Sequence, residues 1–257
     1  MFSDTQIREV FHFCFLDRLL KMSDPRIYVL KGGLNLRFFF NSPRYSEDMD
    51  IDVLAGNVAT LKKNGYKILE DAAFRRSLRS FDIDDIEIND PGKAKQTDTT
   101  QRFRFGLITP AGHHLPTKVE FCRRQQGGND NVTTELINTE VARAYRKLAY
   151  RCQHYAGDVA IVQKVKALAG RTVTQARDVF DLAILYRGGH APSAPLKTLM
   201  PEQELTQAIE CLMDLSWEDY QGQVVEFLDA NSRVEYGDKR AWEWIQTFVL
   251  ESTEANA

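Results

Sequence analysis

The segment from Asp48 to Val53 alternates between aspartate and an apolar residue, and this pattern constrains the fold more than any other part of the chain. Successive side chains of a β-strand point to opposite faces, so a strand here places Asp48, Asp50 and Asp52 on one face and the apolar residues in the core. Carboxylates on one face repel each other unless cations are present. The pattern predicts a site for a hard cation held by Asp48 and Asp50, while Asp52 is interpreted as a solvent-exposed strand end.

The residues before this strand predict a phosphate-binding turn. Residues 27–30 form a short apolar run typical of a strand, residues 34–40 predict a helix, and Lys31-Gly32-Gly33 lies between them. Glycine lets backbone N–H groups approach a phosphate closely, and a helix N-terminus favours negative charge. A double glycine alone is a weak signal, so its weight comes from the acidic strand that follows.

A mixed sheet is expected around these elements. Helices are predicted over 4–21 and 58–80, and strands over 83–88, 101–109 and 115–122, with a turn at 110–113. In the last strand, Lys118 and Glu120 share a face opposite Val119 and Phe121. Glu120 is the candidate third acid of the cation site, and an ion pair with Lys118 or another cation is the alternative reading.

A polar, glycine-containing run at 125–131 predicts a domain boundary. We expect an αβ domain over 1–125 and a helical domain over 132–257, which together make an α+β fold with a mixed sheet and a helical C-terminal domain. Helices are predicted over 139–151, 158–170, 174–186, 201–213, 216–229 and 238–251. Their candidate N-caps are Asp158, Thr174, Ser216 and Asp238.

Composition limits the class of protein. The four cysteines lack CxxC or CxxH spacing, which argues against a zinc site and a disulfide scaffold and favours the reducing cytoplasm. Charged residues interrupt the apolar positions of the first helix, so neither a signal peptide nor a membrane segment is expected. A net charge of −3 gives no whole-molecule attraction to nucleic acid, so any such contact depends on local patches.

Two basic clusters are candidates for such patches. They comprise Lys62, Lys63, Lys67, Arg75, Arg76 and Arg79, and then Arg143, Arg146, Lys147 and Arg151. In the second cluster, Tyr145 and Tyr150 could stack on bases. An ordinary solvated helix face is the competing interpretation of both clusters.

The order of several motifs resembles one family. Lys31-Gly32-Gly33 is followed by Arg44-Tyr45-Ser46-Glu47-Asp48-Met49-Asp50, and later by residues 163–168 (QKVKAL) and 177–182 (RDVFDL). This pattern resembles the AbiEii/AbiGii (MenT-like) toxin nucleotidyltransferases, a branch of the polymerase-β-type superfamily. The resemblance covers about residues 26–186, whereas residues 190–257 match no pattern of the family. The family often has glutamate before the lysine of the third motif, where this chain has Gln163.

The resemblance implies a role for each matching residue. It implies that Asp48 and Asp50 bind Mg²⁺, or Mn²⁺ in its place, and that Glu120 completes the metal site. It implies that Lys164 contacts nucleotide phosphates, with Asp178 or Asp181 organising that region; these acids could act on Lys164, or Asp178 could form a salt bridge with Arg177. The expected nucleotide-binding residues are Lys31, Gly32, Gly33, Ser46, Lys164 and Lys166. Asp48, Asp50, Lys164, Asp178 and Asp181 are the expected catalytic residues, so the helical domain would contribute to the nucleotide pocket.

The function implied is transfer of a nucleoside monophosphate from an NTP to an acceptor hydroxyl. The resemblance implies a tRNA 3′ end as acceptor and a toxin of a toxin–antitoxin or phage-defence pair, with an antitoxin regulator as partner. Nucleotidylation of a protein or a small molecule is one alternative, and a non-catalytic nucleotide-binding module is another. A metal-dependent hydrolase is a weaker reading, because histidines are lacking near Asp48 in the sequence.

Overall fold

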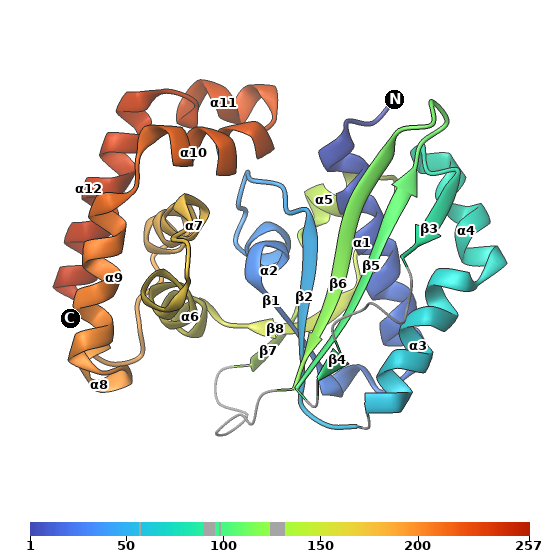
Figure 1. Cartoon of the computed structure of the whole chain (residues 1–257), viewed down its shortest axis with the longest axis horizontal. Helices are drawn as coiled ribbons and strands as arrows, with labels where there is room; N and C mark the ends of the chain where they lie inside the picture. Colours follow the sequence, from blue (N-terminus) through green and yellow to red (C-terminus); the bar gives the residue numbers. More distant parts are fainter. Residues whose placement is uncertain (57, 90–95, 98, 124–131) are drawn as a thin grey trace. The chain divides into compact units, whose positions relative to one another are not determined.

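The structure is a computed structural model that describes residues 1–56, 58–89, 96–97, 99–123 and 132–257. The chain divides into two compact units (Figure 1). The first unit comprises residues 1–39 and 45–154, and the second comprises residues 40–44 and 155–257. Within the described ranges, every helix is too short or too polar to cross a membrane.

The first unit is a mixed sheet with helices. Its helices are α1 (Asp4–Met22), α2 (Gly32–Phe39), α3 (Val58–Glu70), α4 (Ala72–Leu78) and α5 (Thr139–Ala144). Its strands are β1 (Tyr28–Lys31), β2 (Asp48–Val53), β3 (Asp85–Ile88), β4 (Gln96–Thr97), β5 (Thr100–Ile108), β6 (His114–Cys122), β7 (Val132–Leu136) and β8 (Arg151–Tyr155), whose last residue already belongs to the second unit. The strand order is β3-β5-β6-β2-β1-β8-β7, and β4 pairs with β5.

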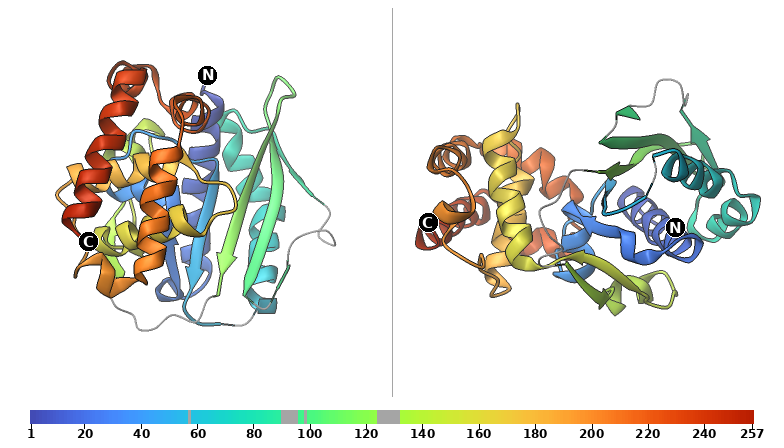
Figure 2. Two further views of the ribbon diagram at one scale, coloured as in Figure 1. Left: turned by 60° about the vertical axis from the view of Figure 1, so that its left-hand side comes forward. Right: turned by 90° about the horizontal axis from the view of Figure 1, so that it is seen from below.

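One face of this sheet is packed against helices. α1 contacts β2 and β6, and α3 contacts α1 and β5. Figure 1 shows these helices on the same side of the strands, and Figure 2 shows that layer from two further sides. The apolar positions Met49, Ile51, Val119 and Phe121 of β2 and β6 are completely buried in this core. The polar positions of the same strands therefore lie on the other face of the sheet.

Sequence features explain where α1 begins. Ser3 accepts a hydrogen bond from the backbone of Gln6, whose side chain accepts one from the backbone of Ser3, which makes a capping box. The helix then buries Phe11, Phe15 and Leu19 against the sheet core. The predicted strands over 83–88, 101–109 and 115–122 are confirmed to within two residues by β3, β5 and β6.

The predicted helix over 139–151 is wrong beyond Ala144. Arg146 adopts a left-handed φ of 52°, and its N–H bonds to the Arg143 carbonyl while that of Lys147 bonds to the Ala142 carbonyl. These bonds form a Schellman motif, which ends a helix. The chain then enters β8, which pairs in parallel with β1 through Leu30 and His154.

This strand also changes the division of the chain. The predicted boundary at 125–131 coincides with residues 124–131, which lie outside the described residues. The structural units divide after His154, because β7 and β8 continue the sheet rather than start the helical part.

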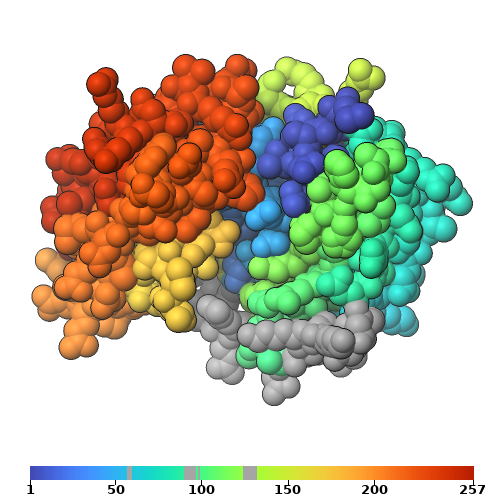
Figure 3. All heavy atoms as spheres, turned by 45° about the horizontal axis from the view of Figure 1, so that its top comes forward, coloured from blue at the N-terminus to red at the C-terminus, as the bar shows by residue number. Residues whose placement is uncertain are grey.

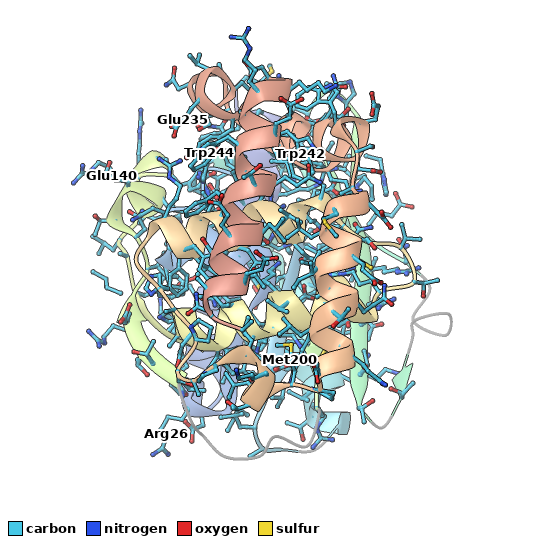
Figure 4. The ribbon with its side chains drawn as sticks, turned by 90° about the vertical axis from the view of Figure 1, so that its left-hand side faces the viewer. Arg26, Glu140, Met200, Glu235, Trp242 and Trp244 are labelled. Carbon is cyan, nitrogen blue, oxygen red and sulfur yellow. The ribbon has the colours of Figure 1, made fainter. Side chains whose placement is uncertain are left out.

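The second unit is helical. It contains α6 (Gly157–Gly170), α7 (Ala176–Arg187), α8 (Leu196–Leu199), α9 (Glu202–Asp214), α10 (Trp217–Gln223), α11 (Ala230–Tyr236) and α12 (Lys239–Ala255). α6 packs against α7 and α9, and α7 packs against α10 and α12. Figure 4 labels Trp242 and Trp244 on α12. Trp242 is buried, and its ring stacks on that of Tyr220 with 4.7 Å between the ring centroids. Trp244 is exposed and stacks on Phe248. The Ser216 and Asp238 caps are confirmed, whereas α6 and α7 follow Ala156 and Gln175 instead of the predicted Asp158 and Thr174.

Candidate active site

The polar face of the first unit brings the sequence-predicted acids together. β2 pairs in parallel with β6, and the register places Asp50 directly opposite Glu120 and Asp48 opposite Lys118. β1 pairs with the other edge of β2 and places Lys31 opposite Asp50. Residues directly opposite each other in a sheet share a face. The prediction that Glu120 lies beside the aspartate pair is therefore confirmed in its geometry.

Basic residues neutralise three of the four acids on this face. Lys118 Nζ lies 2.9 Å from Asp48 Oδ2, and Arg102 Nε lies 2.5 Å from Glu120 Oε2. Lys31 Nζ lies 2.5 Å from Asp52 Oδ1. Asp50 makes no ion pair with any described residue.

The expectation that Asp52 is a solvent-exposed strand end is wrong. Only 5% of the residue is exposed, and its carboxylate forms an ion pair with Lys31. Lys31, predicted to bind nucleotide, thus already has a carboxylate partner in this structure.

The pKa values of the acids reflect these contacts. Burial raises the pKa of Asp50 above its usual range, and the nearby Glu120 and Asp48 charges add to this effect against the opposing effect of Lys31. Burial also acts to raise the pKa of Glu120, but the Arg102 hydrogen bond and charge outweigh it and hold this pKa below its usual range. Asp50 is therefore the acid on this face whose charged form an added cation would stabilise most.

The glycine turn lies against Asp50. Gly32 begins α2 with a left-handed φ of 69°, and a Cβ atom at this position would lie 3.1 Å from Asp50 Oδ2. The absence of a side chain therefore lets the start of the helix approach the carboxylate. Ser46, another predicted nucleotide-binding residue, donates its hydroxyl hydrogen bond to the Asp48 carbonyl at 3.0 Å and so fixes the start of β2.

We expect Gly32→Ala to lower nucleotidyl-transfer activity about 10-fold, because the Asp50 carboxylate must move by a few tenths of an ångström and a misplacement of about 1 Å costs about 100-fold. The added methyl group would push the Asp50 carboxylate away, and the left-handed φ would add about 1–3 kcal/mol of strain. Steady-state transfer rates and thermal melting would measure both effects.

Gly112→Ala is the matched control for this variant. Gly112 has a φ of 78° in the turn between β5 and β6, and nothing lies within 4 Å of its added Cβ. It should show the melting effect of the strain without the loss of activity. Equal activity losses in the two variants would contradict the role given to the Gly32–Asp50 contact.

The helical unit holds a second charged cluster. Lys164 of α6 donates hydrogen bonds to Asp178 Oδ1 at 2.8 Å and Asp181 Oδ2 at 2.5 Å, both on α7. Arg44 donates to both Asp181 oxygens at 3.1 and 3.2 Å, and Arg171 Nε lies 2.8 Å from Asp178 Oδ2. The two aspartates are fully buried, and 8% of Lys164 is exposed. Asp178 and Asp181 thus both hold Lys164, and the cation beside Asp178 is Arg171 where the sequence suggested Arg177.

Compensating charges set the pKa values in this cluster. Burial acts to raise the pKa of Asp181, but the Arg44 and Lys164 charges outweigh it and keep this pKa below its usual range. Burial likewise acts to lower the pKa of Lys164, and the Asp178 and Asp181 charges raise it above its usual value. Asp181 and Lys164 are therefore both charged at neutral pH. Lys166, also predicted to bind nucleotide, is exposed on α6 and apart from this cluster.

Sequence reasoning missed three cations. It gave no role to Arg102, which pairs with Glu120, or to Arg44, and it offered Lys118 as a partner of Glu120 rather than of Asp48. For Arg44 the available signal was its position as the first residue of the motif that contains Asp48. For Arg102 the available signal was its alternation with the buried Phe103, which places Arg102 on the polar face of the strand.

The stacking role suggested for two tyrosines is wrong. Tyr145 is buried and donates its hydroxyl to Glu9 Oε1 at 2.6 Å, and Tyr150 donates to the Phe13 carbonyl at 2.7 Å. The Tyr145 ring therefore belongs to the core of the first unit, and the partly buried Tyr150 ring packs against that core. The basic residues around them keep exposed positions on the surface.

The residues on the sheet face fit a hard divalent cation by their chemistry. Asp48, Asp50 and Glu120 supply carboxylate oxygens, which Mg²⁺ prefers. As the side chains stand, the described residues contain no group of three or more His, Cys, Asp or Glu side chains arranged to hold a metal ion. Asp48 and Glu120 instead face Lys118 and Arg102, so a bound cation would take over the role of these basic groups.

The mixed sheet, its paired aspartates and the glycine turn beside Asp50 define a nucleotidyltransferase of the kind that the motif order resembles. The family model described as nucleotidyl transferase AbiEii toxin, type IV TA system, matches residues 14–232. The chain therefore belongs to the AbiEii family of nucleotidyltransferase toxins. This match extends into the part of the helical unit where the sequence motifs gave no resemblance. No curated protein matches the chain.

Solved structures share the fold. MenT4, a nucleotidyltransferase toxin from Mycobacterium tuberculosis, is 18% identical with a TM-score of 0.63, covering 98% of this chain and 84% of that one. A protein from H. pylori described as a nucleotidyltransferase is 17% identical with a TM-score of 0.56, covering 99% and 98%. JHP933 from Helicobacter pylori is 18% identical with a TM-score of 0.51, covering 99% and 95%. These similarities confirm the predicted α+β fold with a mixed sheet and a helical C-terminal part.

Proposed function

We propose that the protein transfers a nucleoside monophosphate from an NTP to an acceptor hydroxyl in a reaction that depends on Mg²⁺ and releases pyrophosphate. The observation that carries this proposal is the register of β2 with β6, which sets Asp50 opposite Glu120 with Asp48 on the same face. Nucleotidyl transfer needs positioning and charge neutralisation more than covalent help from the protein. Carboxylates clustered beside a glycine turn suit both needs.

The acids would hold the metal ion. Asp48, Asp50 and Glu120 would be the ligands for Mg²⁺, or for Mn²⁺ in its place. The bound ion supplies neutralisation of the phosphate oxygens and of the charge that develops on the leaving pyrophosphate. Asp50 is the central ligand in this proposal, because it is the acid of this face without an ion pair among the described residues.

Backbone and basic groups would bind the triphosphate. The N–H groups at Gly32 and Gly33 lie at the start of α2, where a phosphate is favoured. Ser46 would contribute by holding the start of β2, and Lys31 and Lys166 remain proposed contacts. An ammonium group has three donors, and Asp178 and Asp181 use two of those of Lys164. We propose that the third donor of Lys164 binds a nucleotide phosphate.

The acceptor that we propose is the 3′ end of tRNA. Blocking that end would stop translation, which suits the toxin role that the family name gives. An antitoxin regulator would then be the partner, with a role in phage defence as the further expectation. Since both NTP and tRNA are cytoplasmic, the proposed location is the cytoplasm.

A labelling experiment tests the reaction. The purified protein is incubated with magnesium, total tRNA and each α-labelled NTP in turn, and label on RNA is measured. We expect wild type to label tRNA and Asp48→Ala to give no label, because this variant lacks a metal ligand.

The other outcomes separate the alternatives. Label on a protein or a small molecule, with none on RNA, would keep the transferase chemistry and reject tRNA as acceptor. Absence of transfer to any acceptor would favour a nucleotide-binding module.

A further inference from the structure

A row of cations continues the acidic site across the sheet. The register places Lys118 of β6 between Asp48 of β2 and Arg104 of β5. In the adjacent row, Glu120 lies between Asp50 and Arg102. Neighbouring strands lie about 4.8 Å apart, so the Arg104 backbone is about 10 Å from that of Asp48. All these residues share the face opposite the apolar core.

Arg104 differs from the other cations of this face. It is exposed and makes no ion pair with any described residue, whereas Arg102 and Lys118 pair with acids. Lys118 and Asp48 each keep 30% of the side chain exposed, so this pair also reaches the surface. Figure 3 shows the green atoms of the β5 and β6 segments at the surface of the molecule.

The outer limit of this cationic strip is β3. Its residues Asp85 and Glu87 lie opposite Ile108 and Gly106 of β5, on the same face as Arg104. Asp85 pairs with Arg75 at 2.6 Å, and Glu87 lies 3.9 Å from His114. The strip therefore consists of Arg104 and Lys118, bounded by acids on both sides.

The geometry of the reaction gives this strip a direction. In phosphoryl transfer the attacking and leaving oxygens lie roughly in line. The Gly32 turn, proposed to bind the leaving phosphates, follows β1, which pairs with one edge of β2. β6 pairs with the other edge of β2, and β5 lies beyond it. The acceptor hydroxyl would therefore approach from the side of β6 and β5, where the strip lies.

We propose that Arg104 and Lys118 form the binding site for backbone phosphates of a nucleic-acid acceptor strand whose 3′ hydroxyl attacks the α-phosphate of the NTP and displaces pyrophosphate. This inference rests on the proposed function and assigns its acceptor to a phosphate-bearing class. The guanidinium group of Arg104 can bind a phosphate through two parallel hydrogen bonds. When Asp48 binds a metal ion, the Lys118 ammonium loses its ion pair with Asp48 and adds a second positive charge beside Arg104.

The overall charge of the chain makes such a local site necessary. At a net charge of −3, the molecule as a whole repels RNA. A neutral small-molecule acceptor would gain nothing from two cations in a row. A phosphate backbone gains one contact from each.

The test compares Arg104→Glu with Arg26→Glu in the full-length protein. Arg26, which is labelled in Figure 4, is a matched control, because its ion pair with Asp24 is exposed and it precedes β1, whereas Gly32 follows that strand. Binding of a fluorescent single-stranded RNA with a free 3′ hydroxyl is followed by anisotropy at several salt concentrations, and the KM for NTP is measured alongside.

We expect Arg104→Glu to weaken RNA binding about 10-fold or more and to reduce the salt slope by about one or two, since each lost phosphate contact reduces it by nearly one. Arg104→Gln should show about half this effect, and Lys118→Gln should weaken RNA binding when Mg²⁺ is present. The KM for NTP and the melting temperature of Arg104→Glu should remain within experimental error of wild type. Unchanged RNA affinity and salt slope in Arg104→Glu would overturn the inference.

Failure of the inference is distinct from failure of the proposed function. If wild type labels tRNA and Arg104→Glu binds RNA normally, the inference fails and the transferase reaction stands. If RNA binding depends on Arg104 but wild type labels only a protein, the strip stands as a phosphate site and the tRNA acceptor is rejected.

Discussion

Asp50→Asn is expected to reduce nucleotidyl transfer by about 100- to 1,000-fold while the protein stays as stable as wild type or becomes more stable. The loss follows because removing one electrostatic group from a catalytic site costs about 100- to 1,000-fold, and Asp50 is the central proposed metal ligand. Stability is retained because Asp50 is buried among other acids with a raised pKa. Its charge therefore opposes folding at neutral pH, and asparagine removes that charge at nearly the same volume.

Two measurements check this prediction. Transfer from labelled NTP reports the activity, and the melting temperature at pH 7 reports the stability. Asp85→Asn is the control, since Asp85 lies on the same sheet face in β3 but is 62% exposed and pairs with Arg75. It should change neither quantity measurably. A melting temperature of Asp50→Asn clearly below that of wild type would contradict the electrostatic part of the argument.

The acidic face of the sheet could be predicted from local patterns. The alternation from Asp48 to Val53 defines a strand with its acids on one face, and the same holds for Glu120 between Val119 and Phe121. Both patterns depend only on the period of two residues in a strand. The order of the family motifs along the chain added Lys164, Asp178 and Asp181 to the candidate residues. Both aspartates contact Lys164, which is one of the two roles that the sequence suggested for them.

The partners of the acids could not be predicted, because they depend on sheet register. Lys118 lies two residues from Glu120 on the same face, yet it pairs with Asp48 across the parallel strand and leaves Glu120 to Arg102. A shift of two residues in register would exchange these partners without changing which residues are buried. Nothing in the local sequence of β6 fixes that choice.

The end of α5 shows a second limit. Residues 145–150 contain good helix formers, so their periodicity favours a longer helix than the structure has. The left-handed residue is Arg146 rather than a glycine, and the usual signal of a Schellman motif is therefore missing. Tertiary pairing of β8 with β1 decides the conformation, and with it the position of the boundary between the units.

Lys164→Met is expected to destabilise the helical unit by about 3–5 kcal/mol, which is the usual cost of removing one partner from a buried ion pair. Asp178 and Asp181 are fully buried, and Lys164 is the residue that contacts both. Without its charge, Arg44 and the half-exposed Arg171 would have to compensate two carboxylates alone. Since 1 kcal/mol corresponds to about 4–8 °C for a unit of 60–100 residues, which is close to the size of the helical unit, its melting temperature should fall by roughly 12–40 °C.

Two further variants separate this structural role from phosphate binding. Lys166→Met removes a lysine from the same helix at an exposed position and should change stability by less than about 0.5 kcal/mol. Lys164→Met combined with Asp178→Asn removes one charge of each sign and leaves Arg44 paired with Asp181. This double variant should therefore melt at a higher temperature than Lys164→Met alone, although both should lose affinity for NTP. If Lys164→Met melts like wild type and only NTP affinity falls, then Lys164 acts on the nucleotide alone and the cluster contributes nothing to the helical unit.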